Sequence, residues 1–127
     1  MVRKINPETF PKPASNYSQG IVHKAAAERL IVSGQVGVRP DGSTVLGVDG
    51  QMGQAWANFL AVLSSAGFAP ADVVKVTVYV TVPALAEFRR GREKALAGNA
   101  PAATYVQVAG LASPDYLVEI EGEAVKG

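Results

Sequence analysis

The pattern of apolar and polar residues is clearest over residues 73–82. There valine occupies every second position, and lysine, threonine and tyrosine stand between the valines. An alternation of this kind gives a strand one apolar face and one mixed face. The sequence therefore predicts a β-strand over Val73–Val82.

Two longer stretches carry apolar residues at three- and four-residue steps, which is the spacing of an amphipathic helix. The first is Gly50–Ala66, with Asp49 as the predicted N-cap and Gly67 as the predicted C-cap. The second is Pro83–Ala97, where proline suits the first turn. One side of this second helix is predicted to carry Leu85, Phe88, Arg92 and Leu96.

Three residues near the middle of the first helix bear on the core. Trp56 and Phe59 lie on its apolar stripe and are predicted to be core residues. Asn58 lies beside them and is either a residue of the helix surface or a buried polar anchor. The sequence leaves both readings of Asn58 open.

Five shorter stretches complete the set of predicted strands. Val2–Ile5 is a short edge strand, and Ile21–Ala25 and Arg29–Val36 are predicted to pair as a hairpin. Ala102–Val108 and Leu117–Val125 follow the second helix. This order of elements predicts an α+β fold in which two helices cover one face of a mixed sheet.

The other face of that sheet is predicted to expose apolar residues among polar ones. Thr77, Tyr79, Leu117 and Val125 are expected there. Burying such a face is favourable at about 25 cal/mol per Å² of apolar area. We therefore expect a surface for self-association.

Composition and charge narrow the class of protein. The chain has 127 residues, so one domain over residues 1–127 with a single core is expected. Apolar residues make up 48 % of it, which excludes a disordered chain. The net charge is +1 and the longest basic cluster is Arg89-Arg90, which argues against binding to nucleic acid.

The residue types present also exclude several chemistries. The chain has no cysteine, so thiol nucleophiles, disulfides and cysteine-based zinc sites are ruled out. His23 is the single histidine and is predicted to be an ordinary strand residue, so no metal site is expected. No signal peptide and no apolar run of about 18 residues is visible. We expect a cytoplasmic protein with no membrane partner.

Two polar motifs stand next to predicted strands. Ser33-Gly34-Gln35 ends one strand, and the Asn-Ala-Pro-Ala-Ala-Thr turn over residues 99–104 leads into another. Together with Asn16-Tyr17-Ser18-Gln19 and Val118-Glu119-Ile120-Glu121, they resemble the RidA/YjgF (Rid) family of enamine/imine deaminases almost end to end. The resemblance implies a chorismate-mutase-like (bacillary) fold and a homotrimer. In that assembly three sheets pack into a central barrel, and the sites lie in the clefts between subunits.

The resemblance also implies roles for several residues. Glu119 matches the catalytic-site glutamate and would activate water. Tyr17 matches a tyrosine that lines the cleft, where it would orient water or substrate. Ser33 and Gly34 match a Ser-Gly pair that can donate hydrogen bonds to a substrate oxygen. The residues alone also allow a plainer reading, in which the glutamates at 119, 121 and 123 form a solvated row on one strand face.

Ala103 departs from the family pattern. Archetypal members have arginine at this position, and its planar fork clamps a substrate carboxylate through a pair worth about 1.5–3 kcal/mol. Thr104 offers a hydroxyl nearby, and alternation places Tyr105 on the same strand face as Ala103, where it is expected to fill the vacated space. Arg89 or Arg92 is a candidate for a different clamp, and a solvated basic helix face is the alternative.

Three functions stay open at this point. The first is cofactor-independent hydrolysis of enamines or imines to a carbonyl compound and ammonia, on a substrate that depends less on a carboxylate than 2-aminoacrylate does. The second is a non-catalytic protein that binds a small imine, enamine or carbonyl ligand, or another protein, in the clefts between subunits. The third is an endoribonuclease or translation inhibitor, against which the near-neutral charge and the single histidine argue.

Overall fold

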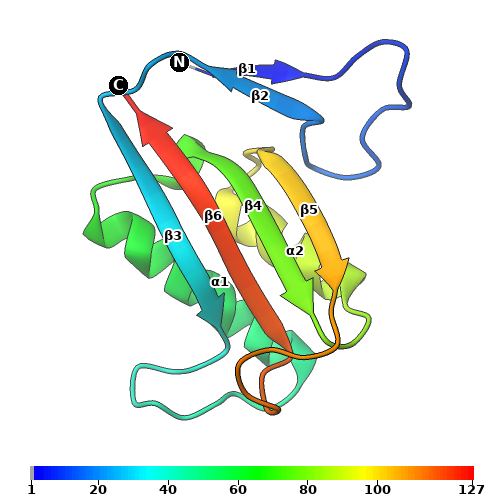
Figure 1. Ribbon diagram of the computed structural model, residues 1–127, viewed down its shortest axis with the longest axis vertical. Helices are drawn as coiled ribbons and strands as arrows, with labels where there is room; N and C mark the ends of the chain where they lie inside the picture. Colours follow the sequence, from blue (N-terminus) through cyan, green and yellow to red (C-terminus); the bar gives the residue numbers. More distant parts are fainter. Residues whose placement is uncertain (1) are drawn as a thin grey trace.

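A four-stranded sheet with two helices behind it forms most of the computed structural model, which describes residues 2–127 (Figure 1). The elements in chain order are β1 (Val2–Ile5), β2 (Gly20–His23), β3 (Glu28–Val36), α1 (Val48–Ser65), the 3₁₀ turn η1 (Pro70–Asp72), β4 (Val73–Val80), α2 (Leu85–Leu96), β5 (Ala102–Gln107) and β6 (Val118–Lys126). This arrangement confirms the predicted α+β class.

The sheet is mixed, as predicted, and its strand order is β3-β6-β4-β5. β4 and β5 are parallel, whereas β6 is antiparallel to both β3 and β4. A parallel pair needs a crossover connection, and α2 supplies it. β3 and β5 are therefore the two edges of the sheet (Figure 1).

The predicted hairpin between Ile21–Ala25 and Arg29–Val36 is wrong. β2 pairs antiparallel with β1 in a separate two-stranded ribbon, and β3 pairs with β6. The physical reason is that Leu30 and Val32 of β3 pack against the core, which a two-stranded ribbon cannot provide. The long antiparallel partner of β3 is β6, the last strand of the chain.

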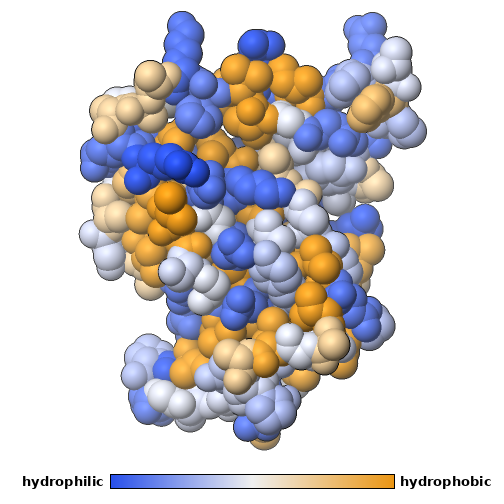
Figure 2. Space-filling view, in the orientation of Figure 1, coloured by the Kyte–Doolittle hydropathy of each residue, from blue (hydrophilic) through white to orange (hydrophobic). Residues whose placement is uncertain are grey.

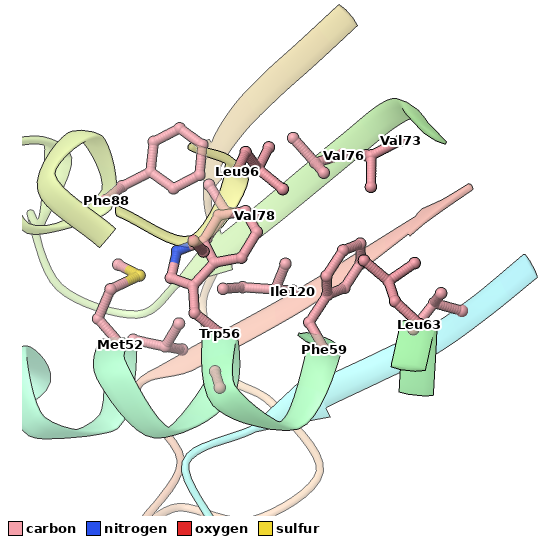
Figure 3. Packing of buried hydrophobic residues seen from close by; sticks show 14 of the residues in the cluster. Met52, Trp56, Phe59, Leu63, Val73, Val76, Val78, Phe88, Leu96 and Ile120 are labelled. Atoms are coloured by element: carbon pink, nitrogen blue, oxygen red, sulfur yellow. The ribbon is translucent and has the colours of Figure 1, made fainter. Parts of the chain in front are cut away.

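The core lies between the sheet and the helices (Figure 3). As predicted, the side chains of Trp56 and Phe59 are buried in it. The Trp56 ring stacks on Phe88 of α2 with a centroid distance of 6.2 Å, and it meets Phe59 edge-on at 5.5 Å. Val78 and Ile120 supply the floor from β4 and β6. One apolar layer therefore joins both helices to the two central strands.

The helix ends differ from the prediction. Asp49 is not the N-cap of α1, because the helix begins at Val48, two residues before the predicted start, and Gly47 occupies the capping position. Gly67 follows the C-cap residue with a positive φ of 77°, which terminates the helix as a glycine there commonly does. Pro83 lies outside α2, since Ala84 is the N-cap residue.

Polar anchors hold the strand ends to α1. The Asn58 amide donates hydrogen bonds to the carbonyls of Val36 and Val38 at 3.0 and 2.9 Å, so this residue is a polar anchor. The side chain of Gln51 is buried and accepts the N–H of Leu117 at 2.8 Å. These bonds fix the chain where β3 ends and where β6 is about to begin.

The face of the sheet that the helices leave uncovered is more polar than predicted. Thr77 and Tyr79 lie there as expected, but Leu117 packs against the core and Val125 is buried. Figure 2 shows hydrophilic and hydrophobic residues intermixed on this face. No helix within residues 2–127 is long and apolar enough to span a membrane.

Candidate functional site

Glu119 of β6 and Gly34 of β3 form the first part of the site. The register of β3 on β6 shifts between Val32 and Gln35, so Ser33 and Gly34 lie in an irregular segment of the edge strand. A Cβ atom on Gly34 would lie 2.5 Å from the Glu119 carboxyl carbon. The carboxyl group of Glu119 therefore occupies the space that a side chain at position 34 would need.

The three glutamates on this strand face do not have equivalent surroundings. Glu121 accepts a hydrogen bond from the Tyr79 hydroxyl at 2.6 Å, and Glu123 pairs with Arg29 at 3.0 Å. The bond to Glu121 raises the pKa of Tyr79, and the charge of Glu119 acts in the same direction. Glu119 is half-buried beside the exposed Ser33 and Gly34. The three glutamates of β6 are therefore not a uniform row of solvated carboxylates.

A cavity of about 170 Å³ between α2 and β5 forms the second part of the site. Its lining residues are Ser15, Tyr17, Leu85, Phe88, Arg89, Arg92, Ala103 and Tyr105. Ala103 and Tyr105 share one face of β5, which confirms the predicted alternation. Leu85 is 42 % exposed and also lines the cavity.

Ser18 brings the N-terminal loop to this cavity. Its hydroxyl donates to the carbonyl of Ala100 and its N–H donates to the carbonyl of Pro101. These bonds hold the loop against the start of β5, so Tyr17 and Ala103 line one cavity. The sequence did not single out Ser18 as a positioning residue, although it stands next to Tyr17 in the motif.

Tyr105 and α2 close the cavity from the inside. The Tyr105 hydroxyl accepts the N–H of Ala84 at 2.8 Å, and its ring lies 6.0 Å from that of Phe88. Tyr105 thus forms a wall beside Ala103 and connects β5 with the beginning of α2.

Both candidate arginines of α2 reach the cavity. Arg92 is buried, and its Nη2 donates to the Ser15 hydroxyl at 3.1 Å. Burial lowers the pKa of Arg92, and the positive charge of Arg89 acts in the same direction. Arg89 is exposed at the lining. The alternative of a solvated basic helix face therefore fails for Arg92.

One chain does not bring the two parts of the site together. Ser33 and Gly34 lie on the edge strand β3 and Glu119 lies on the neighbouring strand β6, whereas β5 is the other edge of the sheet (Figure 1). The cavity lies on the helix side of β5, and Glu119 lies on the uncovered face. Thr104 does not line the cavity with Ala103. It lies on the opposite face of β5, where its hydroxyl accepts a hydrogen bond from Lys75 at 2.8 Å.

The sequence and the fold have known relatives. A family model described as endoribonuclease L-PSP matches residues 8–126. The chain belongs to this family, the RidA/YjgF family. A Rid family protein of unknown function from Yersinia pestis is 36 % identical and shares the fold with a TM-score of 0.87 over 98 % of both chains. The fold of this RidA/YjgF protein is accordingly the chorismate-mutase-like fold.

Curated relatives of similar length carry two kinds of name. A RutC family protein of Pyrococcus horikoshii is 35 % identical over 129 residues, which cover 99 % of both chains. A protein of Salmonella typhimurium named 2-iminobutanoate/2-iminopropanoate deaminase is 33 % identical over 134 residues, again 99 % of both chains. One relative is thus named for a hydrolytic reaction, and the other for its family.

Proposed function

We propose that the protein hydrolyses reactive imines or enamines to a carbonyl compound and ammonia. The observation that carries this proposal is the position of the Glu119 carboxyl group over Gly34, next to Ser33 and apart from the ion pair and hydrogen bond of its neighbouring glutamates. The name of the Salmonella relative supports the same reaction.

The proposed reaction needs a base, a water molecule and a means of holding the substrate. Glu119 takes a proton from water as the water oxygen attacks the imine carbon, and the C=N electron pair moves to nitrogen, which is protonated. The resulting carbinolamine then expels ammonia and forms the C=O bond. An enamine enters the same route after protonation at carbon. Ser33 and Gly34 donate hydrogen bonds to a substrate oxygen, and Tyr17 orients water or substrate.

The proposed site is complete only between subunits. Glu119 of β6 is separated from β5 by β4, and it lies on the uncovered face whereas the cavity lies on the helix side, so a neighbouring chain would supply one part to the other. We propose a homotrimer with the sites in the clefts between subunits. The substrate preference would differ from that for 2-aminoacrylate, because alanine occupies position 103.

Ammonia release tests the proposed reaction. Imines are generated in situ by an amino-acid oxidase, and the wild type is compared with Glu119→Gln and with the control Glu123→Gln, which removes a carboxylate of the same strand face that pairs with Arg29. We expect Glu119→Gln to lose about 100-fold or more in kcat, which is typical for loss of a general base, and Glu123→Gln to keep its activity. Equal activity of wild type and Glu119→Gln would reject Glu119 as the base.

Two other functions make different predictions. A cleft that only binds a small ligand is favoured by the alanine at position 103, and it predicts no acceleration of imine hydrolysis by the wild type. The description of the family model suggests RNA cleavage. A net charge of +1 and an exposed His23 on the separate β1–β2 ribbon give that reaction little support. RNA cleavage that survives repurification and the Glu119→Gln substitution would revive it.

A further inference from the structure

Arg92 is a buried cation with unused hydrogen-bonding capacity. Its residue is 3 % exposed, its guanidinium carbon lies 5.0 Å from the centre of the Phe88 ring, and its Nη2 donates to Ser15. Its Nε is buried and has no hydrogen-bond partner within residues 2–127. A guanidinium has five N–H donors, and leaving a buried donor unpaired is costly.

No salt bridge within residues 2–127 joins Arg92 to a carboxylate, although the negative charge of Glu93 acts to raise the pKa of Arg92. The salt bridges within residues 2–127 use Arg29, Arg90 and Lys126 as the cations. Arg89 lies on the same cavity and adds a second positive charge near the first. Two guanidinium groups at one cavity, one of them buried, favour an anion as the occupant.

The shape of the cavity limits what that anion is. Its volume of about 170 Å³ is below the roughly 300–1,000 Å³ typical of pockets for drug-sized ligands. Apart from the two arginines, its walls include the aromatic rings of Tyr17, Phe88 and Tyr105. Ala103 lines the same cavity as Arg92 and contributes only a methyl group, so the cavity suits a small molecule with one anionic end.

We propose that Arg92, assisted by Arg89, binds the carboxylate of a small organic acid in this cavity. The cation that is missing from β5 at Ala103 is thereby supplied from α2. The choice of a carboxylate rather than another anion rests on the proposed function, whose substrates include imines derived from amino acids. The substrate would then still be recognised by its carboxylate, which Arg92 contacts from α2. Ala103 alone predicts a substrate that depends less on a carboxylate.

Binding of pyruvate and of its uncharged amide, pyruvamide, tests this inference by calorimetry. The wild type is expected to bind pyruvate at least about tenfold more tightly than pyruvamide, and Arg92→Gln is expected to remove that difference, as loss of a charge-assisted pair implies. The control is Arg90→Gln on the same helix, because Arg90 is exposed and pairs with Asp49 outside the cavity. Its pyruvate affinity should match that of the wild type.

A second readout uses the wild-type protein alone. The NMR signal of the Arg92 Nε–H should shift on addition of pyruvate and stay in place on addition of pyruvamide, because that donor has no partner within residues 2–127. This measurement holds even where Arg92→Gln does not fold. Pyruvate binding that leaves the Arg92 signal in place would overturn the inference.

The remaining outcomes separate this inference from the proposed function. Glu123→Gln should bind pyruvate like the wild type, since Glu123 pairs with Arg29 and does not line the cavity. Charge-dependent pyruvate binding without any imine turnover would reject the deaminase and keep the anion site. Equal affinities for pyruvate and pyruvamide in the wild type, or tighter binding of inorganic phosphate, would overturn the carboxylate assignment while leaving the turnover test unaffected.

Discussion

Gly34 shows how the absence of one side chain positions another. Its place in the irregular segment of β3 lets the Glu119 carboxyl group lie over the backbone. Any Cβ at position 34 would meet the carboxyl carbon at 2.5 Å and Oε2 at 2.6 Å, both far closer than ordinary contact. The backbone at Gly34 and the Glu119 carboxyl group therefore pack as one unit.

Substitution of Gly34 by alanine should displace the Glu119 carboxylate, the proposed base. Because the displaced atoms are the end of a flexible, half-buried side chain, we expect kcat to fall about tenfold or more while the melting temperature changes little. The control is Gly20→Ala in β2, where a Cβ would make an ordinary contact of 3.7 Å. Full activity of Gly34→Ala would show that Glu119 need not occupy this position.

Alternation along β5 explains which site residues the sequence could place. Alternation correctly predicted that Tyr105 lies on the same face of β5 as Ala103. The same rule places Thr104 on the opposite face, away from the cavity. The burial of Arg92 could not be predicted in this way. It depends on Ser15, which lies 77 positions earlier and is brought there by the N-terminal loop.

At the scale of elements, local periodicity predicted both helices and β4, because their apolar stripes repeat within a few turns or strand positions. Pairing between distant strands has no such local signal. Glu28 of β3 pairs with Lys126 of β6, which lies close to the other end of the chain, so proximity in sequence favoured the wrong partner for β3. The hairpin prediction failed for this reason.

The contact between α1 and α2 depends on Gly91. A Cβ there would lie 2.6 Å from Cδ1 of the Trp56 ring, which is held between Phe59 and Phe88. Alanine favours a helix interior by about 1 kcal/mol over glycine. The steric clash with a packed ring is expected to outweigh this gain, so Gly91→Ala should lower the free energy of unfolding by about 1–3 kcal/mol.

Urea unfolding measures this effect. The matched control is Gly53→Ala, a second helix glycine, where an added Cβ meets nothing within 4 Å. It should stabilise the protein by about 0.5–1 kcal/mol through helix propensity alone. If both variants were equally stabilised, close packing of the two helices at Gly91 would be refuted.

At the scale of the whole molecule, the argument for self-association differs from the one that the sequence suggested. The sequence suggested it because Leu117 and Val125 were expected on the uncovered face, and neither residue is exposed there. The stronger argument is the separation of Glu119 from the β5 cavity across the sheet. If these groups act together in the proposed reaction, a second copy of the chain has to unite them.

Mixing two inactive variants tests whether the groups meet between subunits. Glu119→Gln and Tyr17→Phe each remove one group, from β6 and from the β5 cavity respectively. If each site combines Glu119 of one subunit with Tyr17 of the next, random reassembly of equal amounts restores about a quarter of the sites, because half of the chains carry each intact group. The measurement is ammonia release after joint denaturation and refolding, with each variant refolded alone as the control. Activity no higher than that of the variants refolded separately would mean that Glu119 and Tyr17 do not act together across a subunit boundary.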